Sequence, residues 1–245
     1  MLDKIFGSSF MKAFLNEGVL FHVTEGYNAL FFILCTLACV ILPYLLGSIN
    51  FAVIISSKQY NDDVRSHGSG NAGMTNMMRT YGKKAAVWTL VGDALKAIVA
   101  ALLGYYAFGL IGAYMAGFFC ILGHLYPIFF KFKGGKGVVT AAASILMCNP
   151  IVFLVLIVLF VIIVFIWRYI SLASIMCVLL YPVILNGVDR LFAGGSGIYM
   201  IFAVLTTVLI VSKHKDNIKR LLDKTESKFE FKKSVKTDNP KDTEK

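Results

Sequence analysis

Residues 65–79 read RSHGSGNAGMTNMMR and form a polar, glycine-rich stretch between two long apolar runs. The glycines at positions 68, 70 and 73 permit turns with positive φ, in which successive N–H groups can converge on an anion. Arg79 adds a planar guanidinium suited to phosphate. We interpret the stretch as a candidate phosphate-binding loop, although a plain connector often has the same composition. Its candidate residues are Ser69, Gly70, Asn71, Thr75, Asn76 and Arg79.

Apolar blocks dominate the rest of the chain. Of the 245 residues, 58% are hydrophobic and only 16% are charged, and the mean hydropathy is +0.73. This composition predicts an all-α, polytopic membrane protein, organised as one helical bundle. A transmembrane β-barrel is disfavoured because the apolar segments are continuous rather than alternating.

The formal net charge of +10 does not indicate a nucleic-acid partner. The basic residues cluster beside the apolar blocks, where such residues set orientation and attract anionic head groups. The five cysteines lie inside apolar runs, in no pattern typical of disulfides or metal ligands. We therefore expect neither a metal nor another cofactor.

The apolar blocks predict about seven transmembrane helices within a membrane domain at 29–222. An amphipathic extension at 1–28 is expected to precede this domain, and a charged cytoplasmic tail at 223–245 to follow it. The first span is expected from about Ala29 to Ser56, with a kink at Pro43 and Gly47. A glycine-rich connector is expected at 186–197. The other expected spans are 85–103, 107–122, 151–166, 170–185 and 198–211, with 138–148 as a short helix or one arm of a hairpin.

Charge placement predicts the orientation of these helices. Most basic residues beside the spans fall on one face, which the positive-inside rule makes cytoplasmic, with the N-terminus outside and the C-terminus in the cytoplasm. Within the second span, Asp93 and Lys96 share one helical face. This pair is either a structural ion pair or part of a binding site, since charges at membrane depth must pair or face the bundle interior.

Two further polar segments lie on the predicted cytoplasmic face. Residues 123–137, GHLYPIFFKFKGGKG, lack the glycine spacing and the Ser or Thr of a Walker loop, so we interpret Lys133 and Lys136 as phosphate ligands rather than nucleotide-loop residues. Topology anchoring is the alternative interpretation of these lysines. In the third segment, 214–220, His214 and Asn217 would share one face if the last helix continued past the membrane.

These segments resemble the membrane-integral glycerol-3-phosphate acyltransferase family that uses acyl phosphate as donor, the PlsY family. The similarity extends over about residues 40–226, although Asn50 stands where the family usually has proline, and Lys224 where glycine is common. The stretch RYISLAS at 168–174 also resembles a polar patch of the family, which adds Ser171 and Ser174 to the candidate phosphate ligands. The matching text is GSI at 47–49, R-x-x-G-S-G-N-x-G-x-T-N-x-x-R-x-x-G at 65–82, G-H-x-x-P-x-F-x-x-F-K-G-G-K-G at 123–137, and H-x-x-N-I-x-R-L at 214–221.

The resemblance implies that a fatty acyl group moves from acyl phosphate to the 1-hydroxyl of glycerol 3-phosphate, giving lysophosphatidic acid and phosphate. It implies a bacterial plasma-membrane enzyme with a cytoplasmic-face site, in which His214 and Asn217 hold the acceptor as the catalytic pair. A soluble enzyme that produces acyl phosphate is a candidate partner.

The residues alone leave another function class open, a transporter or flippase for a phosphorylated metabolite or anionic lipid. The His-x₄-Asp pattern of other glycerolipid acyltransferases is absent. Because no Asp or Glu stands in the three segments where it could deprotonate a glycerol hydroxyl, we expect substrate-assisted chemistry, with His214 mainly orienting the acceptor.

Overall fold

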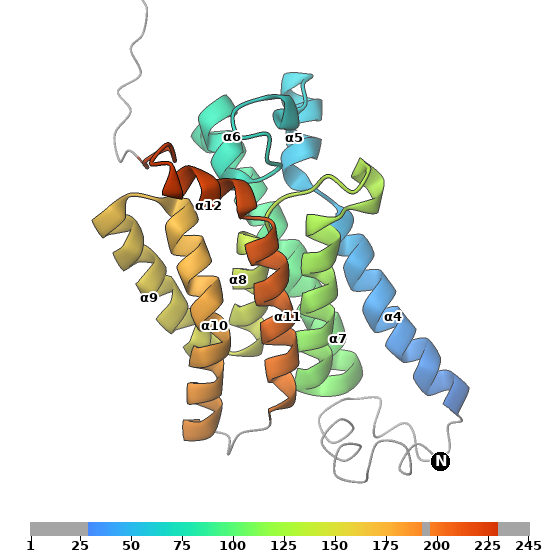
Figure 1. Ribbon diagram of the computed structural model, residues 1–245. Helices are drawn as coiled ribbons and strands as arrows, with labels where there is room; N and C mark the ends of the chain where they lie inside the picture. Colours follow the sequence, from blue (N-terminus) through green and yellow to red (C-terminus); the bar gives the residue numbers. More distant parts are fainter. Residues whose placement is uncertain (1–28, 193–196, 230–245) are drawn as a thin grey trace, which may run out of the picture.

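The computed structural model describes residues 29–192 and 197–229, which form a bundle of α-helices with no strand among them (Figure 1). Short 3₁₀ turns, η1 (Val64–Ser66) and η2 (Ile128–Phe130), lie in the loops at one end of the bundle. The expected extension at 1–28 and the end of the tail lie outside the described residues. The helices are α4 (Ala29–Ser48), α5 (Phe51–Tyr60), α6 (Met74–Tyr81), α7 (Lys83–Leu125), α8 (Val138–Cys148), α9 (Pro150–Trp167), α10 (Ile170–Phe192), α11 (Ile198–Ser212) and α12 (Lys215–Leu222).

Four of the described segments are long and apolar enough to cross a membrane, namely 33–60, 83–130, α9 and α10. A fifth is added if α11 and α12, which meet at a bend of 60°, are counted as one span. The prediction of an all-helical, polytopic membrane protein is confirmed at this level. Seven spans and the orientation stay predictions.

Helix α7 folds back on itself as a hairpin. Phe108 and Gly109 leave helical geometry, and glycine accepts its φ of +60° without steric cost. As a result Asp93 Oδ1 in the first arm lies 3.5 Å from His124 Nδ1 in the second. The spans expected at 85–103 and 107–122 are the two arms of this hairpin.

The first expected span is broken between α4 and α5, just after the kink expected at Pro43 and Gly47, which both lie inside α4. Asn50 caps α5, since its side-chain oxygen accepts the N–H of Val53 at 3.1 Å. Lys96 Nζ donates to the carbonyls of Gly47 and Ile49, at 2.9 and 2.7 Å. These bonds satisfy backbone groups that a break at this depth would otherwise leave unpaired.

Two other predicted boundaries compare differently with the structure. Helices α8 and α9 meet at Asn149, which ends one and caps the other, as expected for a hairpin arm. By contrast, α10 runs to Phe192, so the predicted end near Leu185 is wrong. Val188 packs against the buried cluster that includes Leu185, and this packing outweighs the low helix propensity of Gly187.

Helices α4 and α7 pack against each other with their backbones in close contact, at the end of the bundle that carries the loops. A Cβ atom at Gly47 would lie 2.0 Å from the carbonyl oxygen of Cys120, and one at Gly123 would lie 2.1 Å from that of Tyr44. Glycine allows this approach, and in membranes close packing substitutes for a hydrophobic driving force between helices. Helix α9 buries few side chains, so most of its surface faces outward.

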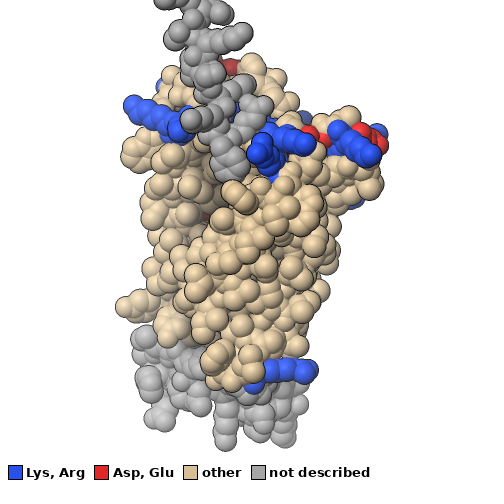
Figure 2. Space-filling model, turned by 90° about the vertical axis from the view of Figure 1, so that its left-hand side faces the viewer, with Lys and Arg blue, Asp and Glu red and all other residues tan. Residues whose placement is uncertain are grey.

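The polar segments meet at one end of the bundle. The loop after α5, helix α6, the loop before α8, the start of α10 and helix α12 all lie there (Figure 1). Figure 2 shows Lys and Arg gathered mainly at the same end, above a broad band without charge on that face. The fold therefore brings segments far apart in sequence to one polar surface.

Candidate active site

A pocket opens where these segments meet, with α6, α8, α10 and α12 around it. It holds about 920 Å³ of empty space, including space open to solvent. Two predicted site residues, Gly70 and Lys133, do not line it. The ten that do are Ser69, Asn71, Thr75, Asn76, Arg79, Lys136, Ser171, Ser174, His214 and Asn217.

The glycine loop adopts part of the predicted backbone geometry. Gly68 and Gly70 have positive φ, of 56° and 67°, whereas Gly73 is extended at −160° and caps α6, so two of the three glycines use the conformation that they permit. The N–H of Gly70 donates to the carbonyl of His67 at 2.9 Å. Gly70 thus closes a turn instead of facing the pocket.

Asn76 braces this loop from inside. Its Oδ1 accepts the N–H of Ser69 at 3.0 Å, and its Nδ2 donates to the carbonyls of Val64 and His67 at 2.9 and 3.0 Å. The side chain is 1% exposed. Because Arg79 follows one turn later on α6, these bonds also fix the helix that presents the guanidinium.

The second and third polar segments are joined inside the pocket. Lys136 Nζ donates to Asn217 Oδ1, and Asn217 Nδ2 donates to Glu226 Oε1 at 2.8 Å. Arg220 Nε donates to Glu226 Oε2 at 2.7 Å. Arg220 and Glu226 line the pocket but were not predicted as site residues, although Arg220 lies one helical turn after Asn217.

Glu226 reaches the pocket because the chain turns back after α12. The N–H of Thr225 donates to the carbonyl of Arg220 at 2.8 Å, and the N–H of Phe229 donates to that of Arg168 at 2.6 Å. Residues 223–229, the first part of the predicted tail, are thus hydrogen-bonded back to α12 and to Arg168, which lies between α9 and α10.

Burial and neighbouring groups shift the pKa values of Lys136 and Glu226, the two ends of this hydrogen-bond network. Burial, with the nearby Arg220, lowers the pKa of Lys136 to about 8. Burial alone would raise the pKa of Glu226, but hydrogen bonds from Arg220 and Asn217 bring it below the usual range. A bound anion would therefore stabilise the charged form of Lys136, while Glu226 stays ionised.

His214 stands at the bend between α11 and α12, with 2% of its surface exposed. The last helix continues past Ser212 only after a bend of 60°, as α12, and the first turn of α12 still carries His214 and Asn217 to one pocket. Nδ1 lies 2.8 Å from the carbonyl oxygen of Ile210. A carbonyl only accepts, so Nδ1 carries the proton, and Nε2 of the neutral ring is left as an acceptor.

Asp93 and His124 line the inner wall of the pocket. Lys96 Nζ lies 2.8 Å from Asp93 Oδ1 and 2.9 Å from His124 Nδ1, and all three side chains are at most 5% exposed. The pair at 93 and 96 is therefore a buried ion pair whose carboxylate end borders the pocket. His124 was missed, and only its place in the G-H-x-x-P pattern hints at a role.

The charge of the pocket suits a phosphorylated ligand. Arg79, Lys136 and Arg220 supply cations, and Ser69, Asn71 and Thr75 are neutral hydrogen-bonding groups. The two carboxylates on its wall are already paired with Arg220 and Lys96.

The sequence of this chain matches a known protein family. The family model for glycerol-3-phosphate acyltransferase matches residues 37–224. The chain belongs to this family. The glycerol-3-phosphate acyltransferase of Bacillus cereus strain G9842 is 41% identical over 197 residues, covering 80% of this chain and 96% of the relative. Glycerol-3-phosphate acyltransferase 3 of Bacillus anthracis is 43% identical over the same length, with the same coverage.

Two crystal structures of PlsY (YgiH), an integral membrane glycerol 3-phosphate acyltransferase, share the fold of this family member. The glycerol 3-phosphate form has a TM-score of 0.73 at 38% identity, and the lysophosphatidic acid form 0.70 at 37%. Each comparison covers 79% of this chain and 95% of the solved one.

Proposed function

We propose that this protein transfers a fatty acyl group from acyl phosphate to the 1-hydroxyl of glycerol 3-phosphate, giving lysophosphatidic acid and phosphate. One observation carries the proposal: three segments distant in sequence bring Arg79, Lys136 and the His214–Asn217 pair to one pocket. Membership of the family and the substrate and product forms of its solved relatives support it.

The pocket supplies what this reaction needs. Acyl phosphate is an activated mixed anhydride, so catalysis needs mainly orientation and stabilisation of charge on the phosphate. Arg79, Lys136 and the neutral groups of the glycine loop hold phosphate, and Asn76 keeps that loop in place. The acceptor hydroxyl oxygen bonds to the acyl carbon, the bond from that carbon to the phosphate oxygen breaks, and inorganic phosphate leaves with the electron pair.

The hydroxyl proton goes to the phosphate of the acceptor itself. Glu226 is bonded to Asn217 and Arg220, and Asp93 is paired with Lys96, so neither carboxylate is a free base. Nε2 of His214 accepts the hydroxyl hydrogen bond and orients the acceptor, with its tautomer fixed by the carbonyl of Ile210.

We assign seven membrane helices to this enzyme, counting both arms of α7 and the short α8, with the N-terminus outside and the C-terminus cytoplasmic. Basic residues at the pocket end support this orientation in a bacterial plasma membrane (Figure 2). The pocket then opens to the cytoplasm, where a soluble enzyme that makes acyl phosphate could deliver the donor. A carrier is less well supported, because the pocket lies at one end of the bundle instead of at its middle.

The test uses purified protein in detergent with acyl phosphate and glycerol 3-phosphate, without nucleotide or added metal. We expect equal amounts of phosphate and lysophosphatidic acid to form, and no phosphate beyond hydrolysis when the acceptor is omitted. Uptake of glycerol 3-phosphate into proteoliposomes, with no acyl transfer in detergent, would favour the carrier instead.

A further inference from the structure

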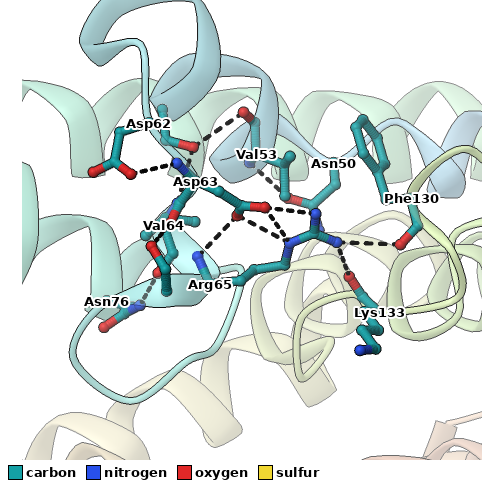
Figure 3. Close-up of polar contacts among 11 residues, drawn as sticks. Asn50, Val53, Asp62, Asp63, Val64, Arg65, Asn76, Phe130 and Lys133 are labelled. Carbon is teal, nitrogen blue, oxygen red and sulfur yellow. Dashed lines mark hydrogen bonds and ion pairs between the residues drawn. The ribbon is translucent and has the colours of Figure 1, made fainter.

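Arg65 links the first polar loop to the second (Figure 3). Its Nη1 donates to the carbonyl of Phe130 at 3.1 Å and to that of Lys133 at 3.2 Å. The rest of the guanidinium meets Asp63, through Nε at 3.0 Å from both carboxylate oxygens and Nη2 at 2.7 Å from one of them. One side chain thus holds a carboxylate of its own loop and two carbonyls of the other.

The Arg65 end of this link is anchored. Asp63 Oδ1 also accepts the backbone N–H of Arg65 at 2.9 Å, which fixes the η1 turn. Asn76 holds the carbonyl of Val64, one residue before Arg65, to α6 (Figure 3). Arg65 therefore extends from a braced backbone, and its side chain is 25% exposed.

The other end of the link holds a strained turn. Lys131 and Phe132 both have positive φ, of 57° and 58°, a conformation that costs energy for residues with a Cβ atom. The carbonyls that Arg65 binds belong to the residues on either side of this pair. The turn is closed by the N–H of Lys133, which donates to the carbonyl of Phe130 at 3.2 Å.

From this turn a short, tightly packed path leads to Lys136. The N–H of Gly135 donates to the carbonyl of His124 at 3.1 Å. A Cβ atom at Gly134 would lie 2.0 Å from that carbonyl oxygen, and one at Gly135 would lie 2.1 Å from His124 Nε2. The segment is thus held by Arg65 on one side and by His124 on the other, immediately before the lysine that bonds Asn217.

We propose that Arg65 is a positioning residue of the active site: it holds the turn at 130–133 so that Lys136 reaches Asn217 and the substrate phosphate. This inference rests on the proposed acyltransferase function and deepens it. Arg65 does not line the pocket, so it acts through Lys136 rather than on the substrate.

The contacts explain why arginine stands at this position. A guanidinium has five N–H donors in a fixed plane, enough to serve Asp63 and both carbonyls together. Lysine keeps the charge but has one nitrogen, which cannot span both carbonyls and the carboxylate with this geometry. Arg65→Lys should therefore release the turn while leaving the charge of the surface unchanged.

Two measurements on Arg65→Lys test the inference, with Arg190→Lys as the matched control. Arg190 is exposed near the far end of α10. We expect amide hydrogens within 128–137 to exchange about tenfold faster in Arg65→Lys, with melting temperature unchanged. We also expect the KM for glycerol 3-phosphate to rise about tenfold while kcat changes far less. Arg190→Lys should match the natural protein in both measurements.

A rescue variant separates positioning from a general loss of structure. Glycine adopts a φ of +57° without strain. Lys131→Gly in the Arg65→Lys background should therefore bring the raised KM for glycerol 3-phosphate part of the way back to that of the natural protein. Unchanged exchange at 128–137, or loss of kcat and melting temperature with no change in KM, overturns the inference. If the natural protein shows no acyl transfer, the proposed function fails, and the exchange comparison still decides whether Arg65 holds the turn.

Discussion

Lys136 Nζ donates a hydrogen bond to Asn217 Oδ1 across 81 residues of sequence, at the point where the second and third polar segments meet. The lysine lies in the loop before α8, and the asparagine in the first turn of α12, beyond the 60° bend from α11. In the proposed reaction this contact joins the lysine assigned to phosphate binding with the asparagine assigned to the acceptor, and Asn217 also bonds Glu226. Changes at Lys136 should therefore affect both substrates.

The first prediction concerns pH. Lys136 is charged below its pKa of about 8 and neutral above it, so phosphate binding should weaken as the pH rises past that value. We expect kcat/KM for glycerol 3-phosphate to fall about tenfold per pH unit in this range. Lys136→Arg stays charged at every pH tested and should flatten this limb, at a lower absolute rate. An unaltered alkaline limb in that variant would assign it to another group.

The second prediction concerns Arg79, which lines the pocket from α6. Arg79→Lys keeps the charge and loses the planar fork, so acyl transfer should fall at least about tenfold, equivalent to about 1.4 kcal/mol. Steady-state kinetics on the folded variant measure this loss. Kinetics equal to those of the natural protein would remove Arg79 from the site.

The third prediction concerns the contact between Gly135 and His124. Gly135→Ala places a methyl group where His124 Nε2 already lies, so the loop or the ring must shift, and a shift of the loop displaces Lys136. We expect KM for glycerol 3-phosphate to rise several-fold. Gly187→Ala is the matched control, because a Cβ atom there meets nothing within 4 Å. Equal kinetics in both variants would show that the loop tolerates the shift.

Most of the site residues that the motifs predicted line the pocket, because the polar groups of each motif are close together in sequence. Such groups stay together in space however the helices of the bundle are arranged. Ser69 to Arg79 lies on one loop and helix, and His214 and Asn217 on one turn, so local sequence was enough to group them. Glu226 escaped prediction because it enters the pocket through the return of 223–229 over α12, which is a tertiary event. The position of the break before α5 was not predicted for a similar reason: Asn50 stabilises it from within the break, as the cap of α5, and Lys96 stabilises it from α7.

The fourth prediction concerns the buried pair of Asp93 and Lys96. Lys96→Met leaves the buried carboxylate of Asp93 with only His124 beside it and removes the donor from the carbonyls of Gly47 and Ile49, so stability should fall by about 3 kcal/mol or more. Replacing Asp93 with leucine as well removes the buried charge but does not replace the lost hydrogen bonds to the two carbonyls. The double variant should therefore recover only part of the lost stability. Thermal unfolding in detergent measures both variants, and full recovery would show that the carbonyl bonds contribute little.

The last prediction concerns the role of His214 in the proposed reaction. Because its Nδ1 donates to the carbonyl of Ile210, Nε2 has a free lone pair that accepts a hydrogen bond from the acceptor hydroxyl, while in the proposed reaction the proton itself goes to the phosphate of the acceptor. His214→Ala should lose nearly all activity, whereas His214→Gln and His214→Asn, which still hydrogen-bond but are not bases near pH 7, should keep a measurable fraction. Initial rates at saturating acyl phosphate give the comparison. If all three folded variants fall to the same background and added imidazole restores the rate, His214 takes the proton itself, and the phosphate of the acceptor is not the base.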